Sequence, residues 1–133
     1  YEPILGMLSP RDRVGQVRSF REYLETRLGA TVRGMWIPER VWEQSMTSDL
    51  AAAGVDYIIL DDSHFKNAGL APDELHGYYL TEDDGVTLKV LPGSEPLRYI
   101  IPFGAVHQAI EYLGNLHQKQ PGAVALFADD GEK

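Results

Sequence analysis

The sequence contains no cysteine among its 133 residues. Disulfides, thiol nucleophiles and thiolate metal sites are therefore excluded, and the composition fits a reducing compartment, so we expect a cytoplasmic protein. No segment approaches the roughly 20 consecutive apolar residues of a membrane span. No signal peptide is visible either, so we expect no membrane partner.

Positive charge is also scarce. Lys and Arg number 12 against 20 Asp and Glu, a formal net charge of −8, and no run of basic residues occurs. Such a chain offers no electrostatic footprint for nucleic acid or anionic lipid, so neither is expected as a partner. An acidic surface of this kind is compatible with binding of a neutral ligand such as a glucan.

The length of the chain fits one domain that spans residues 1–133. This length can bury a substantial core, and a hydrophobic content of 44% is ordinary for a globular protein. The chain begins at Tyr1 rather than Met and ends at Lys133, directly after an acidic loop. We therefore expect a partial domain truncated at both ends, an internal piece of a longer protein.

Helical and strand-like periodicities alternate along the chain. Ser9 and Pro10 predict a helix start, Gly29 predicts its end, and Asp83-Asp84-Gly85 predicts a hairpin within 78–91. The order of elements implies an α/β fold with parallel strands, right-handed crossovers and an inserted β-hairpin. The expected helices are 10–28, 43–53 and 105–116, with a helical turn at 72–75, and the expected strands are 31–37, 55–60, 97–101 and 123–127.

Carboxylates follow the ends of three predicted strands. In parallel α/β folds, sites gather at the carboxyl ends of the strands, so these acids are candidate site residues. Successive side chains of an extended chain point to opposite sides, so only one acid of the last pair is expected to enter a site, and spacing does not say which. The acids are Glu39, Asp61, Asp62, Asp129 and Asp130.

The segment around Glu39 also holds two tryptophans and an arginine. Trp36 precedes the acid, and Arg40 and Trp42 follow it. An indole face can stack on a pyranose, and a carboxylate can attack or protonate the anomeric centre, so the segment favours sugar chemistry. Arg40 can hold the carboxylate ionised, or the two can form an exposed pair of little energetic value.

Asp61, Asp62 and His64 form a second cluster. Two acids with a nearby histidine resemble part of a metal site, but His76 lies twelve residues further on and makes no helix-face pair with His64. A role in lining the substrate site is the better hypothesis, so no metal and no cofactor are expected.

With these residues in view, the chain resembles glycoside hydrolase family 57, in particular its 4-α-glucanotransferase and α-amylase members. The likeness spans nearly all of the chain, and its most specific parts are the Trp-x-x-Glu-Arg-Val and Asp-Asp-Gly-Glu-Lys signatures. The segments that carry it are Tyr1–Leu5, Trp36–Glu43, Val55–Tyr57, Asp61–Phe65, Leu97–Phe103 and Asp129–Lys133.

The resemblance implies part of a (β/α)7 barrel that acts with retention on α-1,4-glucans or maltooligosaccharides. Glu39 occupies the position of the nucleophile and Asp130 that of the general acid/base, which predicts carboxyl groups roughly 5–5.5 Å apart. Transfer of glucan segments is favoured over α-amylase-type hydrolysis. The expected substrate-binding residues are Trp36, Arg40, Asp62, His64 and Glu132.

The chain also departs from the family pattern. Gln44 stands where relatives usually have proline, and Ala128 stands where some have histidine. The family's N-terminal His-Gln segment, its Gly-Gln-x-Glu strand and its late Asn-Asp segment are missing. We therefore expect the isolated chain to be inactive or nearly so, while a homo-oligomer of the longer parent protein stays open.

Two hypotheses from other classes remain. A metal-dependent polysaccharide deacetylase on a related barrel would use Asp61, Asp62 and His64 as ligands, but it needs a paired-histidine motif that the chain lacks. A non-catalytic carbohydrate-binding module would be insensitive to Glu39→Gln.

Overall fold

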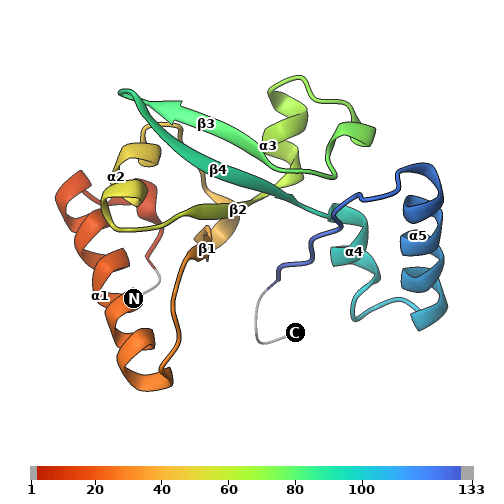
Figure 1. Cartoon of the computed structure of the whole chain (residues 1–133), viewed down its shortest axis with the longest axis horizontal. Helices are drawn as coiled ribbons and strands as arrows, with labels where there is room; N and C mark the ends of the chain where they lie inside the picture. Colours follow the sequence, from red (N-terminus) through yellow and green to blue (C-terminus); the bar gives the residue numbers. More distant parts are fainter. Residues whose placement is uncertain (1–2, 130–133) are drawn as a thin grey trace. The chain divides into compact units, whose positions relative to one another are not determined.

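A computed structural model describes residues 3–129 (Figure 1). Contacts between Cα atoms divide the chain into two compact units. The described part of the first unit falls within Tyr1–Leu60 and Tyr79–Val90, and that of the second within Asp61–Tyr78 and Leu91–Lys133. That 1–133 forms one partial catalytic domain stays a prediction.

The first unit begins with the 3-10 turn η1 (Leu5–Met7) and the helix α1 (Pro10–Leu28). The hydroxyl of Ser9 accepts a hydrogen bond from the backbone N–H of Asp12 (3.3 Å), and proline occupies the first turn. Gly29 ends the helix with φ 63°, a left-handed conformation that costs glycine little. The predicted boundaries of this helix are confirmed.

The helix α2 (Met46–Ala52) lies beside α1 and is shorter than the predicted 43–53 (Figure 1). It starts late because the carbonyls of Glu43 and Gln44 accept turn hydrogen bonds, each 3.0 Å long, from residues three positions on. Side chains from η1, α2 and the sheet form the core of this unit. Those exposed by 1% or less are Leu5, Ile37, Met46, Thr47, Leu50 and Ile58.

The sheet has four strands in the order β1-β2-β4-β3. Its members are β1 (Gly34–Trp36), β2 (Tyr57–Asp61), β3 (Tyr79–Asp83) and β4 (Val86–Gly93). β1 pairs with β2 in parallel, and β3 pairs with β4 as an antiparallel hairpin. Buried and half-exposed residues alternate along β2, so one of its faces is only partly covered within this chain.

The hairpin turn has the predicted chemistry. Asp84 and Gly85 have φ values of 50° and 76°, so both central residues are left-handed, as a two-residue hairpin of matching twist requires. The carboxylate of Glu82 accepts a hydrogen bond from the Gly85 N–H (2.6 Å). The inserted hairpin is therefore confirmed.

The second unit contains α3 (Asp62–Asn67), the turn η3 (Pro72–Glu74), α4 (Glu95–Ile100) and α5 (Val106–Lys119). The prediction of a strand at 97–101 is wrong, because this segment belongs mostly to α4. The hydroxyl of Ser94 caps that helix by accepting from Leu97 N–H (3.4 Å), and Pro96 lies in its first turn. This start signal outweighs the strand preference of the apolar residues that follow.

The final predicted strand, 123–127, is also wrong as an element. Its residues bond to two separate segments instead of one ladder: Val124 N–H donates to the His76 carbonyl (2.9 Å), and the Leu126 carbonyl accepts from Ser94 N–H (2.7 Å). The helix predicted at 105–116 is confirmed as α5. Its apolar face is largely exposed in this chain, with Val106 77% and Ile110 65% accessible.

Candidate active site

The carboxyl end of β1 presents Trp36 and Ile37 to opposite sides. Ile37 is fully buried, and its N–H continues the pairing with β2 by donating to the Ile59 carbonyl (3.3 Å). Trp36 is half-buried. The inward residue of this pair is therefore Ile37, which leaves the indole partly accessible.

Glu39 lies in a tight turn directly after this strand. The turn η2 (Pro38–Arg40) is closed by hydrogen bonds from Arg40 N–H to the Ile37 carbonyl (3.1 Å) and from Val41 N–H to the Pro38 carbonyl (3.3 Å). Glu39 and Arg40 have φ values of 55° and 57°, a region that residues with a Cβ rarely adopt. The Glu39 side chain is exposed.

The side chain of Arg40 folds back onto the strand. Its guanidinium carbon lies 5.4 Å from the centre of the Trp36 ring, which is cation–π distance. One face of the indole is therefore taken by the guanidinium, and a sugar that stacked on Trp36 would use the other face. The structure thus brings Trp36, Glu39 and Arg40 together at one strand end.

In the second unit, the Asp61 carboxylate stabilises the local structure. Its carboxylate caps α3 by accepting from Ser63 N–H (3.1 Å) and forms an ion pair with Arg98 (2.6 Å). Burial opposes ionisation of Asp61, but the hydrogen bonds from Ser63 and the charge of Arg98 outweigh it, so its pKa lies below the ordinary value. The carboxylate therefore stays ionised at neutral pH.

Asp62 is buried, with 4% of its surface exposed. Its Oδ2 pairs with the ammonium of Lys66 (2.9 Å), which also pairs with Glu95 (2.7 Å). Its Oδ1 has no hydrogen-bond partner among residues 3–129. The residue lines a pocket of about 250 Å³ in the second unit, together with residues that include Leu75, His76, Ser94, Glu95, Tyr112 and Leu126.

The two acids considered above as possible metal ligands each form an ion pair with a basic side chain. Asp61 pairs with Arg98 and Asp62 with Lys66, while His64 is half-buried. Within the described part of the chain, no group of three or more His, Cys, Asp or Glu is arranged to hold a metal ion. The arrangement of these acids is that of structural ion pairs.

The remaining predicted site residues, Asp130 and Glu132, lie outside the described residues. Asp129, the last described residue, is half-buried. The separation of the Glu39 and Asp130 carboxyl groups therefore stays a prediction.

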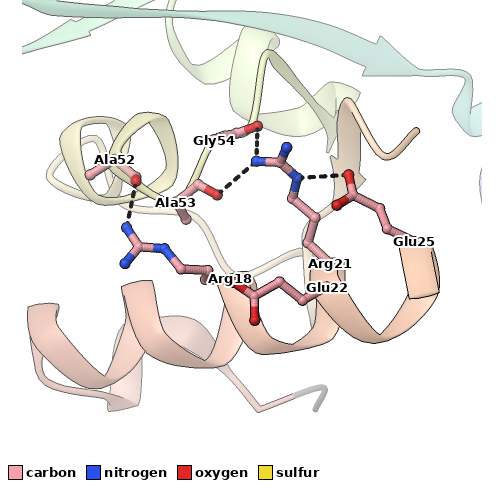
Figure 2. A pocket seen from close by; sticks show the side chains of 7 residues that line it. All are labelled: Arg18, Arg21, Glu22, Glu25, Ala52, Ala53 and Gly54. Carbon is pink, nitrogen blue, oxygen red and sulfur yellow. Dashed lines mark hydrogen bonds and ion pairs between the residues drawn. The ribbon is translucent and has the colours of Figure 1, made fainter. Parts of the chain in front are cut away.

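Two arginines that the sequence analysis overlooked make a clamp on α2, which we call the arginine clamp. Figure 2 shows Arg18 and Arg21 reaching from α1 to the end of α2. Arg18 donates to the Ala52 carbonyl (3.0 Å), and Arg21 donates to the carbonyls of Ala53 (3.4 Å) and Gly54 (3.3 Å).

The clamp borders a surface pocket of about 260 Å³ in the first unit. The three carbonyls belong to a helix end that would otherwise lack partners, so the arginines serve structure here. Their spacing of three residues on one helix face was the sequence signal. The pocket is lined by Arg18, Arg21, Glu22, Glu25, Ala52, Ala53 and Gly54.

None of the helices in residues 3–129 is both long and apolar enough to cross a membrane.

The fold and the strand-end acid together define a class: an α/β protein that carries a candidate site at the carboxyl end of a parallel strand. The crystal structure of 4-alpha-glucanotransferase from Thermococcus litoralis matches all of this chain with a TM-score of 0.94 and 44% identity, over 21% of its own chain. The expected fold, part of a (β/α)7 barrel, is confirmed by this match.

The family model of glycosyl hydrolase family 57 matches residues 1–133, and the chain belongs to this family. The 4-alpha-glucanotransferase of Thermococcus kodakarensis is 46% identical over all 133 residues, which cover 20% of that protein. Alpha-amylase 1 of Dictyoglomus thermophilum is 42% identical, with 19% of its length covered. The chain thus spans about a fifth of the length of these curated relatives.

Proposed function

We propose that this chain is part of the catalytic barrel of a retaining enzyme of α-1,4-glucans, a 4-α-glucanotransferase ahead of an α-amylase-type hydrolase. The observation that carries the proposal is Glu39, exposed on a left-handed turn at the carboxyl end of β1 in a family 57 chain. Relatives named 4-alpha-glucanotransferase at 46% and 44% identity support transfer. Relatives named alpha-amylase keep hydrolysis as the alternative.

The proposed reaction has two displacements. The Glu39 carboxylate attacks the anomeric carbon and forms a glycosyl ester, while the glycosidic C–O bond breaks and the departing oxygen takes the proton of Asp130. The acceptor hydroxyl then attacks the same carbon, gives its proton to Asp130 and releases Glu39. A sugar hydroxyl as acceptor gives transfer, and water gives hydrolysis.

Trp36, Arg40, Asp62, His64 and Glu132 are proposed to line the glucan site. The partly accessible indole of Trp36 supports a stacking role on the face that Arg40 does not cover.

Three further statements belong to this proposal. The chain forms one partial catalytic domain over 1–133, its full-length parent is cytoplasmic, and the isolated 133-residue chain is inactive or nearly so. Coverage of about a fifth of each relative supports the last of these, because a barrel is closed by strands from the whole domain.

The test uses the full-length parent protein with maltotriose as substrate. Glu39→Gln is expected to lower kcat by at least about a thousandfold, because the nucleophile is lost. Glu43→Gln is the matched control, since this exposed acid lies in the same segment and should stay near wild-type activity. Products longer than maltotriose indicate transfer, and glucose and maltose alone indicate hydrolysis.

Chemical rescue tests the stereochemical course. Glu39→Ala with added azide is expected to form a β-glycosyl azide, because azide enters from the side that the carboxylate occupied. Activity of Glu39→Gln within a few fold of wild type would refute the proposed role of this residue.

A further inference from the structure

Two consecutive residues with a Cβ adopt the left-handed region after β1. Among residues 3–129, the only other such residue is Asp84, whose neighbour in the turn is Gly85. At the hairpin, glycine therefore relieves the second left-handed position. In the turn after β1 that position holds Arg40, with φ 57°, so the conformation needs support from the surrounding structure.

The support comes from the strand that precedes the turn. The guanidinium of Arg40 stacks on Trp36 at 5.4 Å, and Trp36 is held in the sheet opposite Ile59. Between them, Ile37 is fully buried and accepts the Arg40 N–H (3.1 Å). The arginine is thus fixed by its side chain to Trp36, the last residue of β1, and by its backbone to Ile37, the residue that follows.

This anchoring determines where the Glu39 carboxylate lies. The direction of the Glu39 side chain follows from its own backbone angles, and these are coupled through the shared peptide to those of Arg40. If Arg40 relaxed to a right-handed conformation, the Glu39 carboxylate would be displaced. Catalytic groups must be held within about 0.5 Å of productive geometry, and a 1 Å error can cost about a hundredfold in rate.

We infer that Arg40 is a positioning residue: by stacking on Trp36 it holds the left-handed turn that aims the Glu39 carboxylate. This inference rests on the proposed function of Glu39 as nucleophile. It is a role beyond lining the glucan site, because it acts on the step in which Glu39 attacks rather than on binding of the glucan.

The test compares Arg40→Gly, Arg40→Ala and Arg40→Lys in the full-length parent. Glycine accepts the left-handed conformation but cannot stack, and alanine neither stacks nor favours it, so both should lower kcat by roughly 10- to 100-fold with KM little changed. Lysine keeps the charge and part of the cation–π contact and should restore part of kcat.

Arg27→Ala is the matched control. It removes a second cation–π pair of the same unit, Arg27 over Tyr23 at 5.7 Å, from the regular helix α1. It is expected to leave kcat and KM unchanged. Melting temperatures, measured in parallel, separate loss of folded enzyme from loss of kcat per folded molecule.

Two outcomes would overturn the inference. A rise in KM with unchanged kcat would make Arg40 a sugar contact only, and unchanged kinetics in Arg40→Gly and Arg40→Ala would leave it without either role. Glu39→Gln is measured alongside: if that variant stays active, the proposed function itself fails, whereas an inactive Glu39→Gln with fully active Arg40 variants contradicts only the positioning role.

Discussion

Replacing Arg13 with methionine would remove the positive half of a buried ion pair in the first unit. The Arg13 side chain is 7% exposed and pairs with Asp49, itself 16% exposed, at 2.6 Å. Arg13 also donates to the carbonyls of Leu5 (3.0 Å) and Leu8 (3.3 Å), so one side chain ties η1, α1 and α2 together. Methionine preserves much of the apolar stem but none of these three bonds.

The expected loss of stability is large because the negative charge of Asp49 would remain largely buried without a partner. Breaking a buried pair by removing one partner typically costs about 3–5 kcal/mol, since the remaining Asp49 carboxylate is left without its counter-ion. At about 1.4 kcal/mol per factor of ten, local opening should become roughly 100- to several-thousand-fold more frequent. Hydrogen–deuterium exchange of the full-length parent, followed in peptides that cover 5–20 and 46–53, measures this directly.

Two further variants make the reasoning refutable. Arg13→Met combined with Asp49→Leu should recover much of the loss, because no unpaired charge remains. Arg33→Met is the matched control, since its 2.8 Å pair with Asp56 is exposed and should matter little. Equal exchange in the Arg13 and Arg33 variants, or a double variant no better than Arg13→Met, would refute the buried-charge argument.

Three other predictions concern stability. The folded pKa of Asp61 is lowered, so its stabilising contribution is present above the ordinary value of about 3.9 and is lost as pH falls through the folded pKa; Asp61→Asn should therefore flatten the acid end of a stability-against-pH curve. Gly54→Ala should destabilise by about 1–2 kcal/mol in thermal melts, because a Cβ would meet Arg21 and φ is +84°, whereas Gly15→Ala, with open space around it, should stabilise slightly. Asp84→Asn should keep or raise the melting temperature, because asparagine accepts the left-handed turn position well.

Local signals in the sequence located most elements of the fold. Helix α1 could be predicted because Ser9, Pro10 and Gly29 each act through the backbone of their immediate neighbours. The segment 97–101 could not, because its apolar residues suit either element and the start signal at Ser94 decides for helix. The stretch 123–127 depends on backbone partners far away in the sequence, which periodicity does not report.

The position of the candidate site in the chain could be predicted from the sequence, but its local geometry could not. Strand order and composition placed Glu39 at a strand end, but glutamate and arginine carry no preference for the left-handed region, so the turn itself was hidden. The stack of Arg40 on Trp36 depends on the same backbone conformation and was hidden with it. Asp61 is the last residue of β2 and Asp62 the first of α3, and their basic partners, Arg98 and Lys66, were not foreseen.

The arginine clamp makes α1 a helix of fixed length. Arg13, Arg18 and Arg21 all reach partners on or next to α2, and each inserted or deleted residue would rotate the rest of the helix by about 100°. A change in length between Arg13 and Arg21 would therefore turn the clamp away from the carbonyls that it holds. The connection at 30–33 is tied to the same clamp, because Glu25 accepts from both Arg21 Nε (3.1 Å) and Val32 N–H (3.3 Å), so an insertion there would disturb it as well.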